Sequence, residues 1–234
     1  MAANRLFVPK HNVVASIDPN QPNTQEYHGL FAYLARSRIH FALTHSPVLY
    51  ADYLQEFWRT AINVVVQGIP AIRATVNGVP ITFTAGMLRE ILHLGTVAEE
   101  DGPVEFSEEL IHGCFLRMGF VGNLAHPFHK HGFRGKWRFL GYMMLVCMSN
   151  RRAGFDAVNL QVASQLVALV LNKPYSFSQY IFNNLRTQVN AVGAARFLMM
   201  PRFVMTIINH FVPGLPPQEL YYVWNPCLND FSRI

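Results

Sequence analysis

Apolar residues recur three or four positions apart along most of the chain, which predicts a series of amphipathic helices. Short polar residues that precede such runs indicate where helices begin. We expect helix starts at Asn23 or Thr24, Ser46-Pro47, Thr84, Ser107, Asp156, and Ser176 or Ser178. Two more helices are expected over residues 136–150 and 196–211, with the second one bent at Pro201.

The period of the pattern changes between residues 63 and 83. β-branched runs at 63–66 and 72–76 are followed by Asn77-Gly78 and by alternating apolar residues up to Phe83. Asn-Gly between two such runs is a strong signal for a β-hairpin, since both residues accept positive φ. A further short strand is expected at 221–223. The predicted fold class is mainly α (α+β): a helical domain with one early β-hairpin.

The chain divides into three parts. We expect an N-terminal extension at 1–22, a mostly helical domain at 23–212, and a C-terminal tail at 213–234 that begins with a proline-rich stretch. Within the domain, the hairpin at 63–83 belongs to an acidic N-terminal part, and residues 110–212 form a basic helical part. The acidic loop at 95–106 is expected to be solvated.

The composition is apolar-rich and charge-poor, with 51% hydrophobic and 14% charged residues. Either the core is large or part of the surface meets another subunit. The helices expected at 136–150, 162–171 and 196–211 are apolar over much of their circumference, and such helices must be surrounded on all sides. One domain of 234 residues can hardly surround all three, so we expect leftover apolar surface and self-association.

The charge is distributed unevenly. Residues 110–218 hold eleven Lys and Arg and one acid, Asp156, a net +10, whereas the flanks hold thirteen acids and eight bases, a net −5. A surface of one sign attracts polyanions whatever fold lies beneath it. RNA or single-stranded DNA is therefore an expected partner.

The densest basic stretch interleaves cations with aromatic rings, the combination that single-stranded nucleic-acid sites use for phosphates and for stacked bases. The alternative interpretation is ordinary packing with a basic rim, and Trp137 is expected to belong to the core. The predicted nucleic-acid-binding residues are Phe128, Lys130, Phe133, Arg134, Lys136, Arg138, Arg151 and Arg152.

Enzymatic chemistry has little support in the sequence. His126, His129 and His131 raise the possibility of a metal-dependent hydrolase, but no Cys pair accompanies them, and no carboxylate lies between Glu109 and Asp156. We expect no metal, no cofactor and no catalytic residue. Three widely separated cysteines and the lack of a secretory signal or membrane-length apolar run favour an intracellular protein, cytoplasmic or nuclear, without membrane contact.

Several blocks look familiar when they are taken together and in order. They are Ile39-His-Phe-Ala-Leu-Thr44 with Pro47-Val-Leu-Tyr50, Gln55-Glu-Phe-Trp-Arg-Thr-Ala61, Ala74-Thr-Val-Asn-Gly78 with Ile81-Thr-Phe-Thr84, Lys136-Trp-Arg-Phe139, Tyr175-Ser-Phe-Ser-Gln-Tyr-Ile-Phe182 and Phe197-Leu-Met-Met-Pro-Arg-Phe203. In this order they resemble the N-terminal, gag-like region of plant long-terminal-repeat retrotransposon polyproteins, which are often mislabelled as synaptobrevin- or longin-like. The hairpin and following helix are also loosely similar to plant transposon-derived mobile domains.

The resemblance implies a non-enzymatic structural or nucleic-acid-packaging domain of a mobile element, with no catalytic residues to carry over. Self-association and non-specific nucleic-acid contact are the activities we expect from it. A protein-interaction module without nucleic-acid binding is the main alternative.

Overall fold

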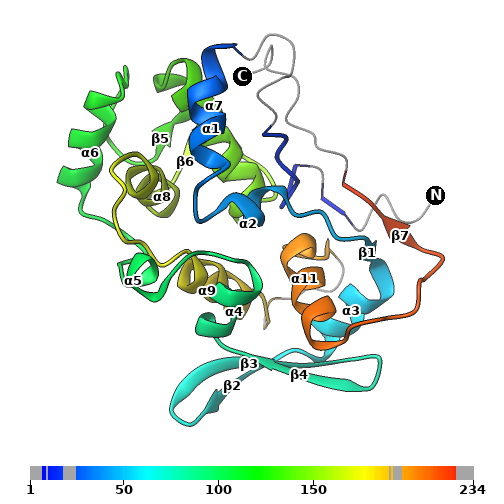
Figure 1. The fold of residues 1–234 in the computed structure, drawn as a ribbon. Helices are drawn as coiled ribbons and strands as arrows, with labels where there is room; N and C mark the ends of the chain where they lie inside the picture. The colour runs from blue at the N-terminus through cyan, green and yellow to red at the C-terminus, as the bar shows by residue number, and fades with distance from the viewer. Residues whose placement is uncertain (1–6, 9, 18–24, 190, 192–196, 225–234) are drawn as a thin grey trace.

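The computed structural model describes residues 7–8, 10–17, 25–189, 191 and 197–224. It confirms the predicted fold class, mainly α with small antiparallel sheets (Figure 1). The helices are α1 (His28–Leu34), α2 (His40–Thr44), α3 (Ala51–Thr60), α4 (Ala85–Ile91), α5 (Val97–Glu100), α6 (Glu108–Arg117), α7 (Gly135–Met143), α8 (Leu160–Val170), α9 (Phe177–Val189) and α11 (Pro201–Phe211). Shorter helical segments are 3-10 turns at Gln25–Tyr27 and Lys130–Gly132 and a π-helical segment at Met144–Met148.

The expected hairpin is confirmed as part of a three-stranded antiparallel sheet, with β2 (Ile62–Val66), β3 (Ile69–Val76) and β4 (Val79–Phe83) in sequential order. Val76 pairs with Val79, so Asn77 and Gly78 form a two-residue turn, and both have positive φ. Gln67 and Gly68 form the preceding turn in the same way. The sheet lies at one end of the molecule, against α3 (Figure 1).

Three of the predicted helix caps are confirmed. Thr84 and Ser107 accept hydrogen bonds from the backbone N–H groups of Met87 and Leu110, and Ser176 accepts one from Gln179. Each cap bonds to a residue only three positions ahead, so local sequence is enough to specify it. The start expected at Asn23 or Thr24 lies outside the described residues.

Three other predicted helix boundaries are wrong. Ser46-Pro47 begins no helix, because β1 (Leu49–Tyr50) pairs first with β7 (Tyr221–Tyr222), the strand expected near the C-terminus. Asn159 rather than Asp156 caps α8, accepting a hydrogen bond from the Val162 N–H. Pro201 does not bend a helix but begins one, since α11 starts there after Met200 takes a left-handed conformation.

The domain encloses all three of the strongly apolar helices, contrary to expectation. Every residue from Met143 to Met148 is buried, as are Val162–Leu169 and Leu198–Ile208. The small sheet carries several of the large apolar side chains that are exposed among the described residues, at Ile62, Val65, Val66, Ile69 and Val79.

The described residues nearest to the two termini pack onto this core. Val13, Val14 and Ala15 are buried, so the part of 1–22 that the structure describes joins the domain instead of extending from it. Within 213–234, β7 pairs with β1, and Trp224 is buried.

The acidic loop is not uniformly solvated. It holds α5, and Glu100 at the end of α5 is buried. Its carboxylate accepts hydrogen bonds from the backbone N–H groups of Phe177 (3.1 Å) and Ser178 (2.8 Å), so it occupies the N-terminus of α9. Burial raises the Glu100 pKa, although these hydrogen bonds act in the opposite direction.

Candidate nucleic-acid interface

The basic aromatic segment is organised by a short strand pairing. β5 (Phe128–His129) pairs antiparallel with β6 (Ala157–Val158). The Lys130 N–H then donates to the Asp156 carbonyl at 2.8 Å. This pairing carries Asp156 away from the helix start where it was expected and places it beside the basic loop.

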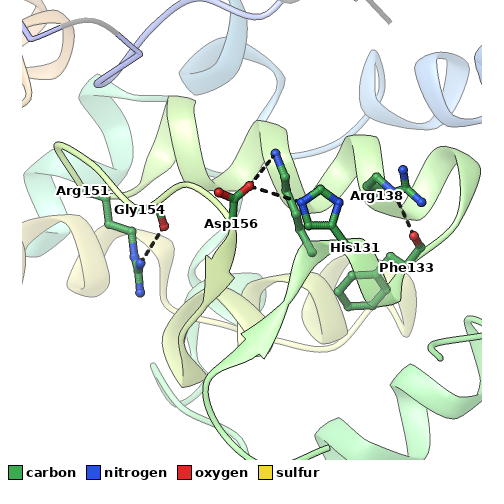
Figure 2. Close-up of polar contacts among 7 residues, drawn as sticks. His131, Phe133, Arg138, Arg151, Gly154 and Asp156 are labelled. Atoms are coloured by element: carbon green, nitrogen blue, oxygen red, sulfur yellow. Dashed lines mark hydrogen bonds and ion pairs between the residues drawn. The ribbon is translucent and has the colours of Figure 1, made fainter. Parts of the chain in front are cut away.

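Asp156 forms an ion pair with Lys130 (Nζ–Oδ1, 3.1 Å). It makes a second contact with His131 (Nε2–Oδ1, 3.5 Å), which Figure 2 shows. The hydrogen bond from Lys130 is the main reason why the Asp156 pKa is lowered. Lys130 is itself buried and lies over the Tyr142 ring, 4.3 Å from its centroid. The only acid of the 110–218 segment is thus neutralised by a base that is largely hidden from solvent.

Phe128 and Phe133 do not offer faces for base stacking, which corrects the prediction. Both rings are fully buried. They pack edge-on against Phe115 at centroid distances of 5.0 and 4.7 Å, and Phe133 also meets Phe120 at 4.8 Å. Edge-to-face packing stabilises such clusters beyond the burial of area alone. The rings therefore belong to the core, as the alternative interpretation held.

Two of the exposed predicted cations lie at the N-terminal end of α7. Arg134 and Lys136 are exposed, and no described carboxylate forms an ion pair with either. Arg138 is half-buried, and its Nε donates to the Phe133 carbonyl at 3.0 Å. Trp137, which was expected in the core, is only partly buried.

Arg151 and Arg152 form a second group in the turn before β6. The Arg151 guanidinium donates to the Gly154 carbonyl at 3.0 Å, and Arg152 is exposed over the Phe197 ring. In Figure 2, Arg151 and Arg138 lie on opposite sides of the Asp156 ion pair. The predicted cations are therefore split into two groups with a neutral pair between them.

The three histidines do not converge. His131 contacts Asp156, whereas His126 lies edge-on to Phe128 and His129 is exposed. Among the described residues, no group of three or more His, Cys, Asp or Glu side chains could hold a metal ion. Cys114 and Cys147 are buried, and burial raises the Cys114 pKa. Cys227 lies outside the described part of the chain.

No helix in the described ranges is long and apolar enough to cross a membrane. Comparison of the chain with models of protein families, with curated protein sequences and with solved structures finds no match.

Proposed function

We propose that the chain is a non-enzymatic, retrotransposon-derived gag-like domain that contacts single-stranded nucleic acid without sequence preference and associates with itself. The observation that carries the proposal is the one-signed charge of residues 110–218. After the Lys130–Asp156 pair cancels, ten of the eleven bases have no acid in the same segment to oppose them.

Much of this charge is accessible to a polyanion. Among the described residues of the segment, the exposed basic side chains are Arg117, Arg134, Lys136, Arg152 and Lys173. Phosphate contacts of this kind release counterions from the nucleic acid, which makes binding sequence-tolerant and strongly dependent on salt.

A salt titration tests the nucleic-acid part of the proposal. Arg134→Gln combined with Arg152→Gln removes two exposed charges from the basic segment. The matched control, Arg59→Gln with Arg73→Gln, removes two exposed charges from the acidic part. For a labelled single strand, the Arg134→Gln/Arg152→Gln variant should have a less steep slope of log K against log salt than the wild type. The slope should change by up to about 1.4, since each phosphate contact contributes ~0.7 to it. The control should leave the slope unchanged.

The exposed apolar sheet supports the self-association part. Val65 and Ile69, at the β2–β3 end of the sheet, are 69% and 55% exposed. An edge strand with apolar side chains is a ready surface for pairing with another chain. Association that persists without any salt-dependent binding of nucleic acid would favour the alternative, a protein-interaction module.

A further inference from the structure

A pocket of about 150 Å³ lies between α1, α7 and α8. Lys136 in the first turn of α7 contributes to its lining, and Arg134 is the N-cap of the same helix. Its lining includes Gly29, Tyr33, Lys136, Trp137, Leu140 and Leu169. These residues come from three separate stretches of sequence, which is why the sequence pattern gave no signal for the pocket.

The aromatic wall of the pocket is held in place. The Tyr33 hydroxyl donates to the Leu169 carbonyl at 2.7 Å, which ties the phenol of α1 to α8. Leu140 and Leu169 are buried and form an apolar floor. A cavity of roughly 150 Å³ can hold one benzene-sized ring.

A cation lies beside this ring-sized space. The Lys136 Nζ is 4.9 Å from the centroid of the Trp137 ring, so the indole holds the ammonium at the pocket. Within the described ranges Lys136 forms no ion pair, and its charge is therefore available to a ligand. The exposed guanidinium of Arg134 lies two residues earlier on the same turn.

We propose that this pocket accepts one base of a single-stranded nucleic acid, with the base against Trp137 and Tyr33 and a neighbouring phosphate on Lys136. Aromatic walls for bases beside cations for phosphates are the elements of non-specific single-strand sites. The inference rests on the proposed function, and it moves the base contact from the buried Phe128 and Phe133 to a different pair of rings.

Gly29→Leu tests the pocket without changing any charge. A Cβ at Gly29 would meet nothing within 4 Å. The residue lies in α1, where a glycine is the weaker helix former, so the variant should fold at least as stably as the wild type. The matched control is Gly113→Leu in α6, where a Cβ also meets nothing within 4 Å.

Binding of fluorescently labelled dT12 is the first measurement. Gly29→Leu should weaken binding roughly 5- to 150-fold, the range expected for one lost base stack, and should leave the salt slope unchanged. Gly113→Leu should bind like the wild type. Urea unfolding of both variants establishes that the loss does not come from a misfolded protein.

Tryptophan fluorescence is the second measurement, because Trp58 and Trp224 are buried whereas Trp137 is partly exposed. We expect dT12 to quench the emission, and an abasic strand of equal length to bind more weakly without quenching. If Gly29→Leu binds dT12 like the wild type and the abasic strand binds equally well, the pocket inference is overturned while the proposed function survives.

Two further outcomes would also count against the inference. If neither strand binds at any salt concentration, the proposed function fails, and the pocket inference fails with it. If a peptide of Glu and Phe quenches Trp137 and dT12 does not, the pocket serves a protein partner.

Discussion

The side-chain oxygen of Asn12 accepts a hydrogen bond from the Arg202 backbone N–H at 2.9 Å, across 190 residues of sequence. The same oxygen accepts from the Phe203 N–H, so Asn12 caps the N-terminus of α11 from a distant part of the chain. The Asn12 Nδ2 donates to the Cys147 carbonyl, and the Arg202 guanidinium donates back to the Asn12 carbonyl and to Cys147. The N-terminal segment is thereby fixed between α11 and the π-helical segment.

Asn12→Gly should destabilise the protein by about 2–3 kcal/mol, because it removes the cap of α11 and leaves buried N–H groups without their partner. Glycine is chosen since Asn12 has φ +53°, which would strain alanine. The measurement is the urea midpoint at constant m-value. Asn172→Gly is the control: Asn172 is exposed with a similar φ of +48°, and its replacement should change stability by less than about 0.5 kcal/mol. Equal midpoints for the two variants would contradict the capping role.

The neighbouring His11 makes stability depend on pH. Its Nδ1–H donates to the Arg151 carbonyl, and its Nε2 accepts from the Met200 N–H, both at 2.8 Å, so the folded state needs a neutral ring. Burial is the main cause that lowers the His11 pKa from 6.5 to about 4, and Arg152 adds to it. Because the unfolded chain binds the proton more tightly, stability is complete above pH 6.5 and falls towards pH 4, by roughly 3 kcal/mol.

His11→Gln isolates this contribution, because glutamine can donate and accept but does not titrate. Its unfolding free energy should lack the fall towards pH 4 that His11 causes, and should keep only the contributions of His45, whose pKa burial lowers, and of Glu100, whose pKa burial raises. The exposed His129→Gln variant should follow the wild type. A wild-type curve parallel to that of His11→Gln would rule out the role of His11.

Glu100 should make stability depend on pH in the direction opposite to that of His11. Its raised pKa means that the folded state holds the proton more tightly than the unfolded chain, so its contribution is complete below the ordinary value of 4.5 and declines as pH rises. Glu100→Gln removes this titration. Between pH 4 and 7, the wild type should lose stability relative to the variant. A relative gain by the wild type would mean that the N–H groups of α9 outweigh the burial of the carboxylate.

Local sequence was sufficient for the elements whose determinants are local. Thr84 and Ser107 cap helices by bonding three residues ahead, and Asn77-Gly78 forms a turn by its own backbone preference. Asn12 and Glu100 cap helices to which they are linked only by tertiary structure, and no periodicity in the sequence identifies such partners.

The candidate site, too, was only partly predictable from the sequence. The distribution of Lys, Arg, Asp and Glu identified the basic segment, and Arg134 and Lys136 in this segment are exposed. The pattern could not tell whether a ring in that segment faces solvent, because that depends on remote neighbours. Phe115 and Phe120 draw Phe133 into the core, whereas Trp137 stays at the rim of a pocket completed by α1 and α8.

Val65→Lys should weaken self-association without destabilising the fold. Val65 lies on β2, an edge strand of the sheet, and its side chain is 69% exposed, so the substitution removes little buried area. A lysine on an edge strand opposes pairing with another chain through charge and hydration. Light scattering over a concentration series should give a lower average mass for the variant than for the wild type at every concentration.

The matched control for this prediction is Val97→Lys on α5, where the side chain is 65% exposed and the charge change is the same. If the sheet is the contact surface, Val97→Lys should associate like the wild type. With added RNA, the wild type and Val97→Lys should both reach a higher average mass than Val65→Lys. If both lysine variants lower the mass equally, net charge controls association rather than the sheet. A wild-type mass that stays monomeric at high micromolar concentration, with and without RNA, would defeat the assembly proposal itself.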